Sequence, residues 1–326
     1  LSCKGTGSAG ECIMRRYPLW LMLGLLSGFL WGCNNYLYDI GARPLLEGNL
    51  AAGIIVPLVC TAVNDMSAAV SLLLVNGIRG ALHAVRTIFH RSGAFLCAAA
   101  LLGGPLGQLS YCLGILWAGP TYALALSALY PVVGCILARV ILHQAITMRM
   151  GLGIALAVTG AVLTAGTPSD FAAPLLLPGL VCGLAAAFCW GSEIVLAVRG
   201  MEDIEPDLAI TLRECISGSA LLFMSLIILP GRLIWEEISS HPDVLGSLVA
   251  AGIIAGASYF LWYAVNRAIG CARGMALNAS YIIWGVLLQW GIGGAMVSGQ
   301  MILGCGLVFA GVVLVSLYPQ KAENIL

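Results

Sequence analysis

Apolar residues along this chain run in long blocks, and each block ends at a short break rich in glycine, proline or charged residues. An α-helix needs roughly 20 consecutive apolar residues to cross the hydrocarbon core of a bilayer. The blocks predict an all-α membrane protein with ten transmembrane helices, near residues 18–40, 50–77, 93–116, 120–142, 149–166, 175–200, 207–230, 245–268, 273–294 and 299–318.

Composition narrows the functions that this chain can have. Hydrophobic residues make up 60% of the 326 positions and charged residues only 9%, whereas about 25% of a soluble protein is charged. The 15 basic residues balance 15 acidic ones and are scattered, so neither a soluble globule nor a nucleic-acid-binding protein is expected. No two of the 12 cysteines stand at the C-x-x-C spacing of metal and redox motifs, so we expect no metal site and no cofactor.

The loops between the predicted helices differ in charge. An even number of crossings places both termini on the same side of the membrane. That side receives Arg15, Arg16, Arg79, Arg86, Arg91, Arg139, Arg149, Arg199, Arg267, Arg273 and Lys321, whereas the other receives only Arg43 and Arg232. Because Lys and Arg are enriched in cytoplasmic loops, both termini are expected in the cytoplasm. Residues 1–14 are expected to form a disordered leader.

The chain also repeats itself. Residues 118–134 align without gaps on residues 269–285, and the alignment pairs Gly119 with Gly270 at an offset of 151 residues. Each half of the chain then holds five predicted helices. Because five is an odd number, the second repeat enters the membrane from the opposite side, which is the inverted-repeat arrangement of alternating-access transporters. The predicted units are a first repeat at 15–166, a linker at 167–178 and a second repeat at 179–326.

A charged side chain at hydrocarbon depth costs at least ~2.5 kcal/mol to insert, so each one needs a partner or a function. Glu193 lies near the middle of the sixth predicted helix, within CWGSEIVLAV. Two interpretations stay open for its carboxyl. Either it has a structural partner, in an ion pair or as a protonated carboxyl hydrogen-bonded to a neighbouring helix, with Arg213 as the candidate. Or it faces a central cavity as the counter-ion of a ligand.

Three further charged residues lie inside predicted helices. Asp65 is midway along the second helix beside Asn64, and the adjacent Arg213 and Glu214 lie inside the seventh. The second and seventh helices are equivalent in the two predicted repeats. An acid on one and an Arg–Glu pair on the other suit mutual neutralisation, so we expect an ion-pair or proton relay there.

Several aromatic side chains lie within apolar segments rather than at membrane interfaces, where aromatic belts form. They are Trp31, Tyr130, Trp190, Tyr281 and Trp284. Any one alone is typical of core packing. Together with one buried carboxylate they offer what a quaternary ammonium requires, which is aromatic faces for cation–π attraction and an anion that neutralises its charge. Asn278 shares a helical face with Tyr281 and Trp284 and would add a polar contact.

These residues lie in motifs that resemble the drug/metabolite transporter superfamily, which includes the EamA-like proteins. SALYPVVG (127–134) and LHQAITMRMGLGIALAVTGAVL (142–163) are similar to its fourth and fifth helices. A narrower likeness, to bacterial choline importers of the LicB type, is carried by LLSGFLWG (25–32), the Asn64–Asp65 step, CWGSEIVL (189–196), YAVNR (263–267) and LNASYIIW (277–284). Two segments depart from this pattern: CNNYLYD (33–39) is more polar, and QLSYC (108–112) does not match.

The resemblance implies a secondary-active importer of choline or a related quaternary ammonium in a bacterial inner membrane. By matched motif position it assigns the substrate to Trp31, Trp190, Glu193, Asn278, Tyr281 and Trp284, and Tyr130 joins them from the aromatic set above. A carboxyl in a low-dielectric cavity is protonated more easily than in water, so proton coupling through Glu193 or Asp65 stays open beside transport driven by the membrane potential alone.

Two rival functions stand beside import. The superfamily also contains exporters of lipophilic cations, amino acids and other metabolites, and the sequence does not separate export from import. An intramembrane enzyme is not expected, because the chain lacks zinc-protease His-Glu spacing and a Gly-x-Ser-x-Gly motif.

Overall fold

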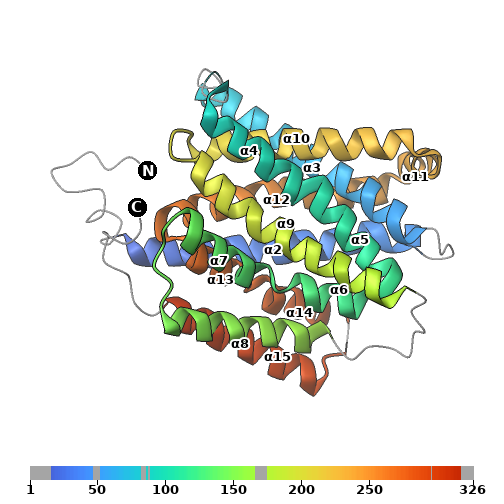
Figure 1. Cartoon of the computed structure of the whole chain (residues 1–326). Helices are drawn as coiled ribbons and strands as arrows, with labels where there is room; N and C mark the ends of the chain where they lie inside the picture. Colours follow the sequence, from blue (N-terminus) through green and yellow to red (C-terminus); the bar gives the residue numbers. More distant parts are fainter. Residues whose placement is uncertain are drawn as a thin grey trace.

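The computed structural model of the protein describes residues 16–46, 52–81, 86, 89–165, 175–294 and 296–316, and all regular structure within them is helical (Figure 1). The predicted leader and most of the predicted linker lie outside these residues. The first half contains α2 (Tyr17–Leu46), α3 (Ala52–Ile78), α4 (Arg91–Leu101), the π-helical turn η2 (Leu102–Leu106), α5 (Gly107–Ala118), α6 (Pro120–Ser127), α7 (Tyr130–Ile141) and α8 (Met148–Ala165). The second half contains α9 (Leu176–Gly200), α10 (Pro206–Ile227), α11 (Leu229–Ser240), α12 (Pro242–Ile269), α13 (Cys271–Asn278), α14 (Tyr281–Gly291) and α15 (Gly299–Ser316).

Nine helical spans in the described part of the chain are long and apolar enough to cross a membrane. They are Ile55–Ile78, Arg91–Ala118, Tyr122–Ile141, Met148–Ala165, Leu176–Gly200, Pro206–Ile227, Pro242–Ile269, Cys271–Gly291 and Gly299–Ser316. The first predicted crossing, in α2, is not among them, although this helix has 30 residues. Asn34, Asn35 and Asp39 interrupt its apolar run. The count of ten crossings therefore stays a prediction.

Two predicted helices are each broken in the structure. The helix predicted at 120–142 divides into α6 and α7, and the one predicted at 273–294 divides into α13 and α14. The breaks obey the 151-residue offset of the sequence alignment, because α6, α7, α13 and α14 begin at residues 120, 130, 271 and 281. Gly119 and Gly270 precede the first piece of each pair, with φ of 95° and 90°, a backbone conformation that glycine adopts without a steric penalty.

Two further features were not predicted. The third helix, expected to run unbroken over 93–116, contains η2, where Pro105 lacks the N–H that a regular α-helix would use. The short helix α11 follows α10 in a stretch predicted to be a loop beyond residue 230. It is amphipathic: Ile238 is buried in an apolar cluster with α3 and α12, Trp235 Nε1 donates to Ser225 Oγ at 2.9 Å, and Arg232 is exposed.

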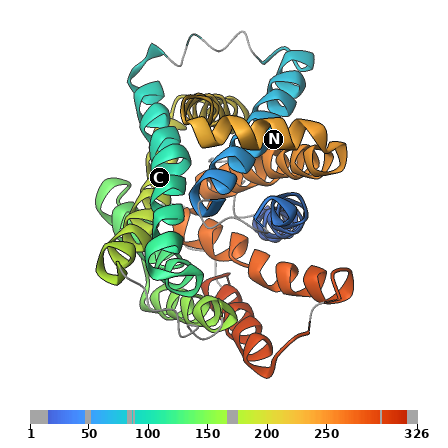
Figure 2. The same cartoon turned by 90° about the vertical axis from the view of Figure 1, so that its right-hand side faces the viewer.

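Helices from the two halves of the chain pack against each other in pairs. α2 lies along α12, α5 along α9, α3 along α10 and α8 along α15. The α8–α15 pair runs side by side at the lower edge of Figures 1 and 2. Small residues permit the close approach of α8 and α15, since a Cβ added at Gly153 or Gly160 of α8 would overlap the backbone of Gly311 or Gly304. The interior of the bundle is thus an interface between the two halves.

Candidate functional site

A cavity of about 480 Å³ lies inside the bundle, between the two halves of the chain. Its walls come from α2, α3, η2, α5, α9, α10, α12 and the broken helices α6–α7 and α13–α14. This volume is within the range of pockets that hold small ligands. Eight of the ten residues predicted for the substrate or the relay line it: Trp31, Asp65, Tyr130, Trp190, Glu193, Arg213, Asn278 and Tyr281.

Glu193 lies on α9 and is only 2% exposed. Its Oε1 accepts hydrogen bonds from Arg213 Nε at 2.7 Å and from the Tyr263 hydroxyl at 3.3 Å. Its Oε2 accepts none from the described residues and lies beside Gly103 of η2, where a Cβ would overlap the carboxylate. Glycine at this position therefore keeps room for the carboxylate at the cavity wall. Glu193 therefore forms the ion pair with Arg213 and also borders the cavity, and its role as the counter-ion of a ligand stays a prediction.

Arg213 joins three carboxylates in one cluster. Besides Glu193, its Nη1 lies 2.9 Å from Glu214 Oε1 and 3.5 Å from Asp65 Oδ2. Its guanidinium carbon is 4.7 Å from the centroid of the Tyr259 ring. Glu214 is fully buried behind Arg213 and does not line the cavity. Three negative groups against one positive group make the cluster acidic when all four are ionised, with a formal charge of −2.

Asp65 is held on its other side by a chain of polar contacts. Ser217 Oγ donates to Asp65 Oδ2 at 2.6 Å, and Asn64 Nδ2 lies 3.5 Å from Asp65 Oδ1. Asn34 of α2 then donates to Asn64 Oδ1 at 2.7 Å. The network connects α2, α3 and α10 across the two halves, so a change of charge at Asp65 would be felt on three helices.

Aromatic rings stand in two groups along the cavity wall. Trp31 lies 4.7 Å from Tyr259 between ring centroids, in an edge-on arrangement, and Trp190 lies 5.4 Å from Tyr111. The Trp190 indole donates to the carbonyl of Gly103 at 3.1 Å, which fixes the ring beside η2. The cavity therefore combines π-faces with the acidic cluster.

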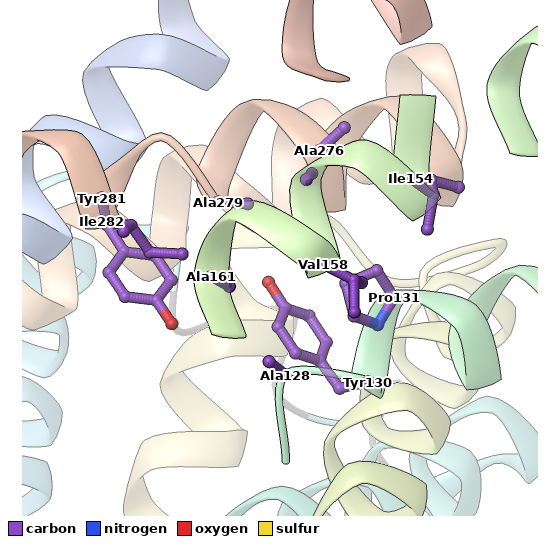
Figure 3. Close-up of a pocket in the computed structure, with 11 residues that line it drawn as sticks. Ala128, Tyr130, Pro131, Ile154, Val158, Ala161, Ala276, Ala279, Tyr281 and Ile282 are labelled. Atoms are coloured by element: carbon purple, nitrogen blue, oxygen red, sulfur yellow. The ribbon is translucent and has the colours of Figure 1, made fainter. Parts of the chain in front are cut away.

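Tyr130 and Tyr281, which are equivalent in the repeat alignment, also line a crevice of about 20 Å³ against α8. In Figure 3 their hydroxyl groups are turned towards each other. Asn278 is at the cavity wall, where its Nδ2 donates to Ser27 Oγ at 2.9 Å. Trp284 is not part of the lining, because its ring packs edge-on against Phe29 at 5.2 Å.

Several lining residues were not among the predicted site residues. Asn34, Asn35 and Tyr38 come from the polar segment 33–39, and Gln108, Tyr111 and Cys112 from the segment 108–112. These are the two segments that depart from the choline-importer pattern, so the departures were themselves a signal of the cavity. Tyr259 and Trp262 could not be recognised in this way, because aromatic residues in an apolar helix are typical of core packing. No group of His, Cys, Asp and Glu in the described part of the chain has the arrangement of a metal site.

Comparison with known proteins agrees with this architecture. Residues 177–317 match the EamA-like transporter family. Protein LicB of Haemophilus influenzae is 29% identical over 279 residues, which cover 82% of this chain and 87% of LicB. A protein of known crystal structure superposes with a TM-score of 0.68 over 91% of this chain and 97% of that chain, at 16% identity, and so supports the fold alone.

The apolar helices and the family match define a multi-pass membrane transporter. Most of its second half matches the EamA-like transporter family, and the chain as a whole is similar to LicB. The family resemblance predicted from the sequence is thereby confirmed.

Proposed function

We propose that this protein imports choline or a related quaternary ammonium by alternating access around the central cavity. Glu193 supplies the counter-ion, Trp31, Tyr130, Trp190 and Tyr281 supply aromatic faces, and Asn278 meets the ligand hydroxyl. The likeness to LicB and the composition of the cavity wall support this substrate class.

The Glu193 carboxylate carries this proposal. Its Oε2 accepts no hydrogen bond from the described residues, and Glu193 shares the cavity wall with Trp190 and Trp31. A quaternary ammonium donates no conventional hydrogen bond, so charge attraction and aromatic contact are what a protein can offer it. The acidic cluster also disfavours ligands with a carboxylate, because Arg213 already pairs with three acids.

The transport cycle follows from the proposed repeats. Residues 15–166 and 179–326 form two inverted five-helix halves joined by the linker 167–178. Helices of both halves line the cavity, and the halves rock about it. The protein lies in a bacterial inner membrane with both termini in the cytoplasm. An inside-negative potential favours entry of a cation by about 2.3 kcal/mol per 100 mV. Protonation of Glu193 or Asp65 is the second candidate driving force.

Binding of three matched ligands to purified protein tests the substrate class. Choline should bind most tightly. Its neutral isostere 3,3-dimethylbutan-1-ol loses both cation–π and charge attraction and should bind at least roughly tenfold more weakly, since about 1.4 kcal/mol corresponds to a factor of ten. Glycine betaine, which adds a carboxylate, should also bind more weakly because it meets the acidic cluster.

Two outcomes would contradict this assignment. Equal dissociation constants for choline and the isostere would mean that the ligand charge is not recognised. Preference for a bulky cationic dye over choline would favour an exporter of lipophilic cations. The variant Glu193→Gln should bind choline more weakly than the wild type. Glu202→Gln is its matched control, because Glu202 pairs with Arg199 at the surface, where its side chain is 52% exposed.

A further inference from the structure

Arg213 already occupies the Glu193 contact that the proposed ligand would use, and it also lies against an aromatic ring of the cavity wall. Its Nε donates to Glu193 Oε1 at 2.7 Å, and its guanidinium carbon lies 4.7 Å from the centroid of the Tyr259 ring. A carboxylate together with an aromatic face is also the combination that stabilises a quaternary ammonium. The side-chain cation and a ligand cation would therefore compete for the negative charge of Glu193.

Two other carboxylates lie within reach of the same guanidinium. Arg213 Nη1 is 2.9 Å from Glu214 Oε1 and 3.5 Å from Asp65 Oδ2. Glu214 is fully buried, and its Oε2 has no hydrogen-bond partner among the described residues. A rotation of the guanidinium towards Glu214 would let both carboxylate oxygens accept hydrogen bonds, in the bidentate geometry that arginine favours. Glu214 thus offers Arg213 a bidentate ion pair when Arg213 leaves Glu193.

The charge balance of the cluster permits this exchange. Arg213 is the only basic residue in the described lining of the cavity, and three carboxylates surround it. A ligand cation that pairs with Glu193 reduces the excess of negative charge, and Arg213 keeps two acidic partners. An empty carrier without Arg213 would instead hold Glu193 buried with no cation beside it, which is unfavourable in a low-dielectric interior.

We propose that Arg213 is a tethered cation, which neutralises Glu193 in the empty transporter and pairs with Glu214 and Asp65 when a ligand ammonium takes its place. This inference rests on the proposed function and adds a mechanism to it. If Arg213 acts in this way, the ligand-free transporter changes between its two orientations with Glu193 paired to Arg213. Arg213 then matters more for the return of the empty carrier than for the movement of the loaded one.

Two modes of transport by the variant Arg213→Gln separate these steps. Exchange into liposomes preloaded with unlabelled choline requires only that the loaded carrier moves, whereas net uptake into empty liposomes also requires the empty carrier to return. We expect the ratio of net uptake to exchange to fall roughly tenfold, within the usual range of coupling between sites. Arg213→Lys, which keeps a cation, should lie nearer to the wild type. Arg267→Gln removes an arginine paired with Glu205 away from the cavity and should leave the ratio unchanged.

A second variant measures the competition directly. Glu214→Gln removes the second partner of Arg213 and should hold the guanidinium on Glu193, so the Kd for choline should rise roughly tenfold. This readout also serves if Arg213→Gln does not fold. The inference is overturned if Arg213→Gln leaves the ratio of net uptake to exchange unchanged, or if Glu214→Gln leaves the Kd unchanged. The proposed function still stands in that case, provided that the wild-type protein takes up choline. A wild type that binds no quaternary ammonium overturns both.

Discussion

Replacing Gly103 with alanine tests whether Glu193 has the position that ligand binding requires. A Cβ at residue 103 would overlap both carboxylate oxygens and the carboxyl carbon of Glu193. The carboxylate also accepts hydrogen bonds from Arg213 and Tyr263, so the overlap must either turn it out of its position at the cavity wall or displace η2. A displaced carboxylate loses its attraction to the ligand ammonium. Loss of an interaction with a charged group costs about 1.5–3 kcal/mol. The Kd for choline should therefore rise roughly 10- to 100-fold.

The assay is equilibrium binding of radiolabelled choline to purified protein in detergent, with thermal unfolding measured on the same samples. Gly151→Ala is the matched control. Gly151 lies in the helix α8, and apart from its two chain neighbours and its own helical backbone no heavy atom lies within 4 Å of the added Cβ. Because alanine is favoured over glycine inside a helix by roughly 0.5–1 kcal/mol, this variant should unfold at the same or a higher temperature. Its Kd should equal that of the wild type.

A second substitution separates a steric cause from a general loss of structure. Glu193→Asp shortens the side chain by one methylene and withdraws the carboxylate from the added Cβ. The double variant Gly103→Ala, Glu193→Asp should therefore lose less affinity than the sum of the two single losses. A wild-type Kd for Gly103→Ala would refute the reasoning, because it would mean that the position of Glu193 does not matter to the ligand.

Three other substitutions test separate parts of the structure. Trp190→Leu should raise the Kd for choline roughly 3- to 30-fold through loss of cation–π attraction. Phe188→Leu, at a residue 55% exposed on the same helix, should leave the Kd unchanged. Equal effects of the two variants would contradict the role of Trp190 as an aromatic face for the ligand. Gln144→Ala removes the side-chain oxygen that accepts from the Cys271 backbone N–H at 3.0 Å, and should lower stability by about 1–2 kcal/mol, seen as earlier thermal unfolding. Gly119→Ala forces a non-glycine residue to φ of 95° and should lower the free energy of unfolding by about 1–3 kcal/mol, seen in the same assay. Unchanged unfolding of Gln144→Ala would show that its hydrogen bond is dispensable, and unchanged unfolding of Gly119→Ala would show the same for the turn.

Hydropathy predicted the helices well, because a long apolar segment in a membrane can satisfy its own backbone hydrogen bonds only as a helix. It missed the breaks at 128–129 and 279–280, which are built from alanine, leucine and serine and look helical in composition. Such turns are set by tertiary contacts. The repeat alignment did carry a trace of them, since it paired Gly119 with Gly270.

The polar residues of the site were easier to predict than the aromatic ones. A charge such as Glu193 stands out in an apolar helix, and Arg213 could be named as its candidate partner from the sequence. Tyr259 did not stand out, because an aromatic residue in an apolar helix is typical of core packing. The position of Trp284 against Phe29, outside the cavity lining, depends on how α14 packs against α2, which helical spacing alone does not determine.

Uptake of radiolabelled choline into proteoliposomes with an inside-negative potential, compared between the wild type, Glu193→Gln and Glu202→Gln, addresses the role of the buried glutamate most directly. The wild type and Glu202→Gln should accumulate choline at similar initial rates, whereas Glu193→Gln should be at least roughly tenfold slower at low choline concentration. A parallel series with an imposed pH gradient should show whether protons contribute. Wild-type rates in Glu193→Gln would contradict a transporter that recognises its ligand through this carboxylate.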